Sequence, residues 1–319
     1  MFLKKLLPFA TVAMVSTAAM AWEPTGPITV TVPSSPTSLH ATGFQSIEDA
    51  LGVEVIYEFK PGAAGIIGTK HFLQTHPVDG HHVLLTTSIS HVMGEVTNPE
   101  LVTYDWENDF EFTSGLITSS IVIAVKSDTP VDNLAALVEW IRSSDKPLNV
   151  TTTFPNQIVA MNLILEAEGI SKDKVNFVKY KKSAEAVKDV AAGVVEIWVG
   201  GMPPTVAFYE SKDIKYVAVM SSERLPRLPN TETVNETYPG ILQMSTVGAL
   251  LAKGTDPEIV KWYETNLAKA VQSEKALAER DKRMINIDKA ALNAKGLKAA
   301  YKANRKLLEP GYKEIFGDK

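Results

Sequence analysis

The stretch Lys60-Pro61-Gly62-Ala63-Ala64-Gly65-Ile66-Ile67-Gly68-Thr69-Lys70 decides the fold, because it joins a strand to a helix through a turn of small residues. The run 53–59 before it is rich in β-branched and aromatic residues, which predicts a strand. Pro61-Gly62 ends that strand, and apolar residues then recur at helical spacing. The free N–H groups and the dipole of a helix N-terminus favour an anion. We interpret Ala63-Ala64-Gly65 as half of a carboxylate-binding site.

The three glycines of this stretch, Gly62, Gly65 and Gly68, also allow a plainer interpretation. Their spacing is G-x-x-G-x-x-G, which differs from the dinucleotide fingerprint G-x-G-x-x-G. A Walker loop is excluded because Thr69 follows the last glycine. The glycines could serve only to let a strand and a helix pack closely, and the stretch by itself does not separate this alternative from ligand binding.

The N-terminal end has the features of a secretory signal peptide. Lys4 and Lys5 precede an apolar run over 6–19, and Ala19-Met20-Ala21 matches an A-x-A cleavage pattern. We predict that residues 1–21 are a signal peptide cleaved after Ala21, which leaves 298 residues; an uncleaved membrane anchor is the alternative. Because the chain has no cysteine, it can form neither disulfides nor a lipid-modified cysteine. We expect a soluble periplasmic protein.

The net charge and the length of the chain limit the classes of function that the protein can have. Without Lys4 and Lys5, the 32 basic residues become 30 against 37 acidic ones, a net charge of −7. Such a negative chain is a poor partner for nucleic acid, and an anion would have to be bound by local backbone donors and helix ends. A chain of about 300 residues usually forms two domains.

The strand–turn–helix pattern occurs three times near the N-terminus. It covers 28–51, where Ser38 is a plausible helix N-cap, then 53–73, and then a strand at 82–86 followed by a polar loop at 87–91. In a parallel sheet these turns lie at the carboxyl ends of the strands, where ligands of open α/β sheets bind.

A second alternation of strands and helices follows, and its strands carry their own apolar residues. This predicts a second α/β domain, with strands at 121–125, 148–152, 175–180, 194–199 and 214–220. A further strand at 246–251 precedes a helix that opens with Asp256-Pro257. The lysine-rich tail is predicted to be helical apart from a short strand at 284–287.

Several short motifs in this order resemble one family. The fragments are Trp22-Glu23-Pro24, Pro61-Gly62-Ala63-Ala64-Gly65, Pro77-Val78-Asp79-Gly80, Asp109-Phe110, Tyr180-Lys181, Gly193 with Glu196, Ser222-Glu223-Arg224-Leu225-Pro226, and Thr231 with Asn235-Glu236. Together they resemble the Bug or TctC family, the extracytoplasmic solute receptors of tripartite tricarboxylate transporters. The resemblance covers essentially the whole chain after residue 21.

The first loop departs from the family pattern. The family usually has Pro-x-x-Pro-Gly-Gly-x-x-Asp, whereas this chain has Pro33-Ser34-Ser35-Pro36-Thr37-Ser38-Leu39-His40, with neither the glycine pair nor the aspartate. Hydroxyls can replace amides as donors, so the transport role is retained, but the identity of the ligand does not carry over. The missing acid, with His40 nearby, suggests a more negative ligand or one without an amino group.

The resemblance implies a type II periplasmic-binding-protein fold, an α/β architecture in which two domains are joined by two crossover strands. We expect a discontinuous domain 1 over 22–120 and 244–319, a domain 2 over 121–243, and a ligand in the cleft between them, closed by a hinge. The expected ligand-binding residues are Ser34, Ser35, Thr37, Ser38, Ala63, Ala64, Gly65, Thr87, Ser88, His91, Thr152, Thr153, Phe154, Gly200, Gly201 and Met202. Phe154 and Met202 could pack against an apolar part of the ligand, or could equally be ordinary packing.

Catalytic and metal chemistry find little support. All six histidines lie between residues 40 and 91, but there is no H-E-x-x-H and no cysteine, so surface or loop histidines are favoured over a metal site. No G-x-S-x-G elbow occurs, which disfavours a serine hydrolase. We expect no metal, no cofactor and no catalytic residue. His91, after a strand end, could meet a carboxylate and make affinity depend on pH.

The leading interpretation is a receptor that captures a small di- or tricarboxylate, possibly aromatic, without changing it. It would act as a monomer and deliver the ligand to the membrane subunits of a tripartite tricarboxylate-type transporter, with domain closure as its mechanism. A receptor that presents its ligand to a sensor kinase is an alternative that the sequence does not separate from transport. A secreted hydrolase is the less favoured one.

Overall fold

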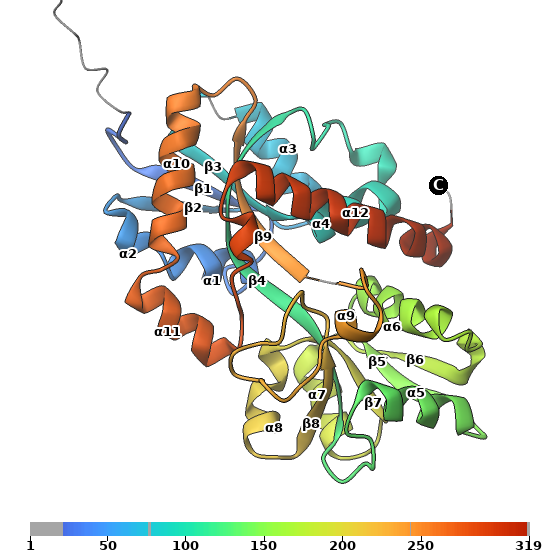
Figure 1. Cartoon of the computed structure of the whole chain (residues 1–319). Helices are drawn as coiled ribbons and strands as arrows, with labels where there is room; N and C mark the ends of the chain where they lie inside the picture. Colours follow the sequence, from blue (N-terminus) through green and yellow to red (C-terminus); the bar gives the residue numbers. More distant parts are fainter. Residues whose placement is uncertain (1–21, 76–77, 243, 318–319) are drawn as a thin grey trace, which may run out of the picture.

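The computed structural model describes residues 22–75, 78–242 and 244–317, and the predicted signal peptide lies outside them. In this part of the chain nine strands form one sheet, in the order β2-β1-β3-β9-β4-β7-β5-β6, with β8 paired to β4 (Figure 1). The strands are β1 Ile28–Val32, β2 Val55–Phe59, β3 His82–Thr87, β4 Phe110–Lys126, β5 Leu148–Thr152, β6 Val175–Lys179, β7 Ile197–Gly201, β8 Ile214–Val219 and β9 Met244–Ala252.

Helices connect the strands and cover both faces of the sheet. The α-helices are α1 Leu39–Gln45, α2 Glu48–Leu51, α3 Ile66–Thr75, α4 Ser88–Thr97, α5 Leu134–Ser143, α6 Pro155–Ala167, α7 Ser183–Ala191, α8 Val206–Glu210, α9 Val234–Thr237, α10 Pro257–Ala270, α11 Glu274–Arg283 and α12 Ala294–Phe316. Short 3-10 helices are η1 Ala63–Gly65, η2 Pro99–Leu101, η3 Lys172–Lys174, η4 Pro203–Thr205 and η5 Lys289–Ala291.

The long strand β4 divides the molecule into two lobes. From Phe110 to Ser120 it pairs with β9, and from Ile121 onward it pairs with β7 and β8. Figure 1 shows β4 leaving the lobe that contains β1 to β3 and entering the lobe that contains β5 to β8. The chain returns to the first lobe with β9. This is the two-lobed α/β fold of type II periplasmic binding proteins, as the family resemblance implied.

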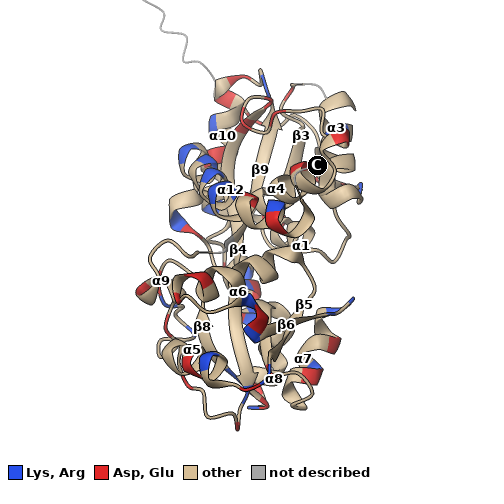
Figure 2. Cartoon of the chain, turned by 90° about the vertical axis from the view of Figure 1, so that its right-hand side faces the viewer, with Lys and Arg blue, Asp and Glu red and all other residues tan. Residues whose placement is uncertain are grey.

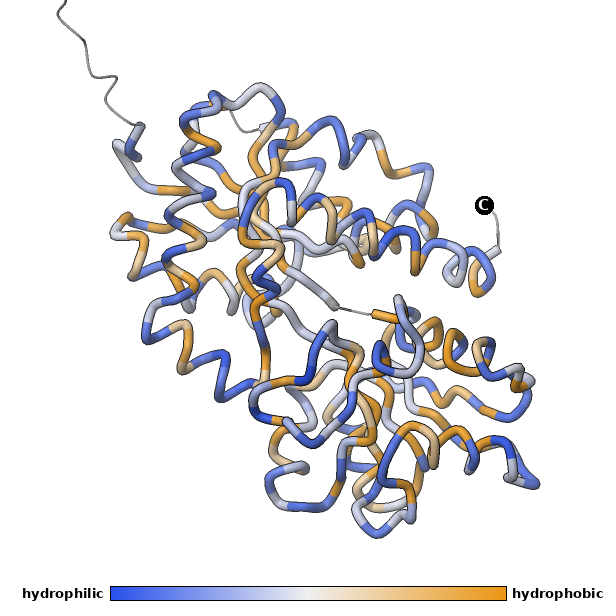
Figure 3. Tube along the Cα trace, in the orientation of Figure 1, coloured by the Kyte–Doolittle hydropathy of each residue, from blue (hydrophilic) through white to orange (hydrophobic). Residues whose placement is uncertain are grey.

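Each lobe has apolar packing on both faces of its half of the sheet, because helices cover both faces of its strands. In the first lobe, α1, α10 and α11 cover one face and α3 and α12 the other. In the second lobe, α5 and α6 cover one face and α7 and α8 the other. Figure 3 shows these apolar segments lying along the strands and the inward sides of the helices.

Helices of the two lobes also pack directly on each other. Val92 of α4 and Leu308 and Tyr312 of α12, all from the first lobe, share a buried cluster with Val159 of α6 from the second. Figure 2 shows α4 and α12 on one side of this contact and α6 on the other. Because α4 and α6 each begin at a strand end, this contact brings one strand end of each lobe toward the other.

The sequence-based predictions for residues 87–91 and 194–199 are wrong in detail. The polar loop expected at 87–91 is the start of α4, because the Thr87 hydroxyl accepts a hydrogen bond from the Ser90 amide at 3.1 Å and caps the helix. The strand expected at 194–199 begins only at Ile197, because the Val194 amide still bonds to the Asp189 carbonyl at the end of α7. Gly200 and Gly201 therefore lie inside β7.

The short strand expected at 284–287 is also not formed. Only Asn286 pairs there, as an isolated antiparallel bridge to Thr118 of β4. The neighbouring residues turn away because Met284 has a left-handed backbone (φ 50°) at the end of α11, and η5 begins at Lys289. This irregular segment lies along the edge of β4 at the point where the lobes meet.

Candidate functional site

The turn after β2 has an unusual backbone. Gly62, Ala63, Ala64 and Gly65 all have positive φ angles, of 133°, 45°, 53° and 97°. For alanine this left-handed conformation costs roughly 1–2 kcal/mol, because Cβ crowds the carbonyl oxygen. Such strain persists only where the surroundings enforce it, and it is concentrated at functional sites. The glycines at either end adopt these angles without the penalty.

The third glycine has a different role. A Cβ on Gly68 would lie 2.7 Å from Cα of Pro33 and 2.8 Å from the Lys60 carbonyl oxygen, so α3 packs directly on the turn after β1. Both interpretations of the glycine spacing are therefore partly right. Gly68 allows close packing, whereas Gly62 and Gly65 allow the turn. This packing holds the turns after β1 and β2 side by side.

The first loop forms a tight turn that leads into α1. The Ser38 amide donates to the Ser35 carbonyl at 3.0 Å, and the Ser38 hydroxyl caps α1 by accepting from the Ala41 amide at 3.3 Å. The N-cap assignment of Ser38 is thus confirmed. Ser35 and Thr37 are exposed and Ser34 and Ser38 are half-buried. The exposed hydroxyls of this loop remain open to a ligand.

The end of β3 is held by the C-terminal helix. The Ser88 hydroxyl accepts a hydrogen bond from Asn304 of α12 at 2.9 Å, and the Thr86 carbonyl accepts one from the Tyr301 hydroxyl at 2.7 Å. Helix α4 lies against η1, so all three turns of the first lobe adjoin one another. Sequence reasoning missed Asn304 and Tyr301. No local pattern could have indicated them, because more than 200 residues separate them from their partners.

His91 is buried near these strand ends, and His40 is half-buried with both of its ring nitrogens buried. His91 is 3% exposed, bonds through Nε2 to the Thr86 hydroxyl at 3.0 Å, and packs among Tyr104, Phe110 and Tyr301. Burial lowers the pKa of His91 to about 3 and that of His40 to about 4. Both rings are neutral at pH 5 to 8, which removes the titration that the expected pH-dependent contact of His91 requires.

The strand ends of the second lobe form their own cluster. The Gln157 side-chain oxygen accepts from the backbone amides of Thr153 and Phe154, and the Thr153 hydroxyl lies 3.3 Å from that of Ser183. Phe154 is 57% exposed at the start of α6, so its ring is free to meet a ligand or a partner. Gln157 and Ser183 were not predicted.

We call the residues at these strand ends, Ser34–Ser38, Ala63–Gly65, Thr87–Ser88 and Thr152–Phe154, the strand-tip cluster. The structure brings the three turns of the first lobe together, and α4 and α6 link them to the turn of the second lobe. Gly200 and Gly201 lie apart from this list, inside β7 and paired with Val122 and Ile121 of β4.

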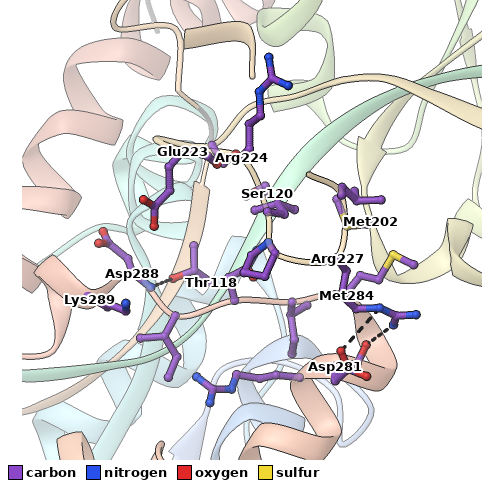
Figure 4. A pocket seen from close by; sticks show the side chains of 18 of the residues that line it. Thr118, Ser120, Met202, Glu223, Arg224, Arg227, Asp281, Met284, Asp288 and Lys289 are labelled. Atoms are coloured by element: carbon purple, nitrogen blue, oxygen red, sulfur yellow. Dashed lines mark hydrogen bonds and ion pairs between the residues drawn. The ribbon is translucent and has the colours of Figure 1, made fainter. Parts of the chain in front are cut away.

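A separate cavity of about 370 Å³ lies where the lobes meet. It is bounded by Thr118 and Ser120 of β4, by the loop 221–228 after β8, and by residues of α11, η5 and the segment between them (Figure 4). We call it the hinge pocket. Of the residues predicted to bind ligand, only Met202 lines it.

Among residues 22–75, 78–242 and 244–317, no group of three or more histidine, aspartate or glutamate side chains is placed to hold a metal ion. No helix within these ranges is long and apolar enough to cross a bilayer.

The sequence of the chain is similar to those of known proteins. Residues 43–295 match the model of the tripartite tricarboxylate transporter family receptors. The chain is similar to protein BugT of Bordetella pertussis, with 26% identity over 237 residues, which is 74% of this chain and 72% of BugT.

Solved structures show the same fold. A TctC solute-binding protein from Polaromonas superposes with a TM-score of 0.75 at 20% identity, over 91% of this chain and 99% of that one. A Rhodopseudomonas palustris protein solved with adipate gives 0.71 at 20% identity, over 92% and 98%. MatC of the same organism, solved with malate, gives 0.66 at 18% identity, over 91% and 100%.

Proposed function

The chain belongs to the tripartite tricarboxylate transporter receptor family, a family of periplasmic solute-binding proteins, and from this premise we propose that it captures a small di- or tricarboxylate between its lobes. The ligand is held at the strand-tip cluster and delivered to the membrane subunits of a transporter. The chain changes no bond of the ligand. It reaches the periplasm after cleavage behind Ala21.

The observation that carries the proposal is the strained turn at Ala63-Ala64. Packing of Gly68 on Pro33 and of α4 on η1 enforces a left-handed backbone that two alanines would otherwise avoid. A turn kept at such cost between a strand and a helix supports close approach of a ligand to the backbone.

The ligand class follows from the donors and from the family. The cluster offers backbone N–H groups and the exposed hydroxyls of Ser35 and Thr37, and these suit carboxylate oxygens. Relatives in fold have been solved with malate and adipate, both dicarboxylates. Because His40 and His91 are neutral, recognition does not depend on histidine charge near pH 7.

The mechanism is closure of two lobes about β4 and β9. We place the lobes at 22–120 with 244–319 and at 121–243. A ligand that contacts both lobes stabilises the closed arrangement by its differential affinity for it. The exposed Phe154 is positioned to cover the ligand as the second lobe approaches.

A thermal-shift screen tests this proposal. The chain without residues 1–21 is melted in the presence of malate, adipate, citrate, acetate and glutamate. A ligand that binds only the folded state raises the melting temperature with concentration. We expect a rise for at least one di- or tricarboxylate and a smaller one for acetate. No response to malate, adipate or citrate, or a larger response to glutamate, which differs from them by its amino group, would contradict the ligand class.

Two variants assign the response to the strand-tip cluster. Ala64→Asp adds a negative charge at the turn, and aspartate tolerates the left-handed backbone, so the fold should survive. We expect at least a tenfold loss of affinity by calorimetry. Ala303→Asp, at an exposed position of α12, adds the same charge away from the site and should bind as the unmodified chain does.

A further inference from the structure

The hinge pocket is built from both lobes and from the strand that joins them. Ser120 lies at the position of β4 where its pairing changes from the first lobe to the second. The loop 221–228 belongs to the second lobe, and Gln272–Lys289 belongs to the first. Figure 4 shows the side chains of Ser120, Met202, Arg227 and Met284 surrounding the space. Any occupant would contact both lobes at once.

Two residues that line this pocket each have a buried side-chain polar atom without a hydrogen-bond partner within the described residues. These atoms are the Ser120 hydroxyl oxygen and the Asn286 side-chain nitrogen. Ser120 is only 2% exposed. A buried polar group without a partner costs roughly 1–3 kcal/mol, and native structures keep such groups mainly where a ligand or water satisfies them. Both atoms can donate a hydrogen bond.

Arg280 adds an uncompensated positive charge. Its Nε donates to the Ala276 carbonyl at 3.3 Å, and no carboxylate in the described part of the chain pairs with its guanidinium. Burial alone lowers the pKa of Arg280 below its usual range. The other two arginines that line the pocket differ. Arg224 pairs with Glu236 at 2.7 Å, and Arg227 pairs with Asp281, the latter shown by dashed lines in Figure 4.

The remaining walls are apolar or acidic. Met202, Leu225, Leu228, Met284 and Ile285 are buried side chains that line the space. The acids Glu223, Asp281 and Asp288 also lie on its border. Apolar walls favour a hydrocarbon chain, and the acids disfavour a ligand with a second carboxylate.

We propose that the hinge pocket is a second ligand site, for a small monocarboxylate with a short apolar chain. The carboxylate pairs with Arg280 and accepts hydrogen bonds from Ser120 and Asn286, while the chain lies against the methionine and leucine side chains. A guanidinium and a carboxylate can form two parallel hydrogen bonds, which compensates a desolvated charge well. This site goes beyond the proposed capture of di- or tricarboxylates.

An occupant of this site acts on the lobes. It contacts loop 221–228, α11 and β4 together, so its affinity depends on how the lobes are placed. By thermodynamic linkage, the occupant of the hinge pocket changes the affinity of the strand-tip cluster for its ligand by a certain factor. The strand-tip ligand changes the affinity of the hinge pocket for its occupant by the same factor. The two sites are therefore coupled through the hinge.

Calorimetry with hexanoate as the probe tests the site, with 1-hexanol as the uncharged control. We expect hexanoate to bind and 1-hexanol to bind at least tenfold more weakly. Arg280→Gln should weaken hexanoate binding at least tenfold, and Ser120→Ala should weaken it several-fold. Arg283→Gln is the matched control, because Arg283 is on the same helix but pairs with Glu279 and does not line the pocket. It should bind hexanoate as the unmodified chain does.

The Ala64→Asp variant separates this site from the strand-tip cluster. Hexanoate binding that survives Ala64→Asp and is lost in Arg280→Gln supports the second site, whatever the cluster binds. Binding that is lost in Ala64→Asp and kept in folded Arg280→Gln places hexanoate at the cluster and overturns the second site without touching the proposed function. No hexanoate binding at millimolar concentration also overturns it.

Discussion

The strand-tip cluster and the hinge pocket differ in which part of the chain carries the unfavourable interactions, the backbone or the side chains. In the cluster Ser88 bonds to Asn304 and the Thr153 hydroxyl lies 3.3 Å from that of Ser183, and the strain lies in the backbone at Ala63-Ala64. The ring nitrogens of His40, next to the cluster, are an exception, because neither has a partner among the described residues. In the hinge pocket the polar groups Ser120, Asn286 and Arg280 lack partners or counter-charges among the described residues. One region is shaped before a ligand arrives, and the other is left to be completed by one.

This difference predicts how each region responds to substitution. A preshaped turn depends on the packing that enforces it, so damage to that packing should destabilise the whole lobe. An unsatisfied polar group already costs stability, so its removal should cost little or even help. Substitutions in the two regions should therefore change the free energy of unfolding in opposite directions. Three measurements test this difference.

The largest effect is expected at Gly68. Valine there would place its Cβ 2.7 Å from Cα of Pro33 and 2.8 Å from the Lys60 carbonyl oxygen, and neither backbone can yield easily. We expect Gly68→Val to lower the free energy of unfolding by about 3 kcal/mol, the upper part of the range for overpacking. Urea titration measures it. Gly26→Val is the control, because a Cβ there has its nearest neighbour at 4.0 Å and should change little.

A stable Gly68→Val variant would show that α3 does not enforce the turn. The strain at Ala63-Ala64 would then need another cause, and the contrast between the two regions would lose its basis. Loss of stability together with loss of carboxylate response would support the view that the packing shapes the cluster.

The sequence predicts the strand-tip region well because its signals are local. A strand, two turn residues and an amphipathic helix appear within about twenty residues, and each has its own physical preference. Ser38 could be recognised as an N-cap because a hydroxyl before a helix has a known partner three residues later. The start of α4 was missed because Thr87 caps it within a run of polar residues that reads as a loop.

The hinge pocket could not be predicted in this way. Its walls come from Ser120, from the loop 221–228 and from Arg280–Lys289, which are brought together only by the crossing of β4 and the bridge to Asn286. The motif Ser222–Pro226 in this loop resembles the family, but it does not indicate that the loop lines a pocket. The sequence also could not predict the burial of His91 and of the His40 ring nitrogens, because a polar residue on a short helix does not indicate which residues will cover it.

Acid provides the second test, because the hinge pocket contains no histidine and the strand ends contain two. The folded-state pKa values of His40 and His91, about 4 and about 3, lie below the unfolded value near 6.5. The unfolded chain therefore binds more protons, so stability is complete above pH 6.5 and falls as the pH decreases toward 4. Between pH 7 and pH 5 each histidine should remove about 2 kcal/mol.

Chemical denaturation at pH 7, 6 and 5 measures this slope. His40→Gln should reduce the histidine contribution by about half, and the comparison with the unmodified chain cancels the titration of nearby Glu95 and Glu309, which pair with Arg305 beside His91. Identical slopes in the two chains would mean that His40 is not buried neutral, and that the strand ends are more open than the structure indicates.

The smallest effect on stability, and the sharpest contrast, is expected from two residues of β4 that line the hinge pocket. Thr118 and Ser120 both line it, but the Thr118 hydroxyl lies 3.0 Å from that of Thr246 and accepts from the Asp288 amide at 3.2 Å, whereas the Ser120 hydroxyl has no partner among the described residues. Thr118→Ala should lower the free energy of unfolding by about 1–2 kcal/mol, and Ser120→Ala should leave it unchanged or raise it by up to about 1 kcal/mol. If Ser120→Ala destabilises as much as Thr118→Ala, the hydroxyl already has a partner such as bound water, and the hinge pocket is complete without a ligand.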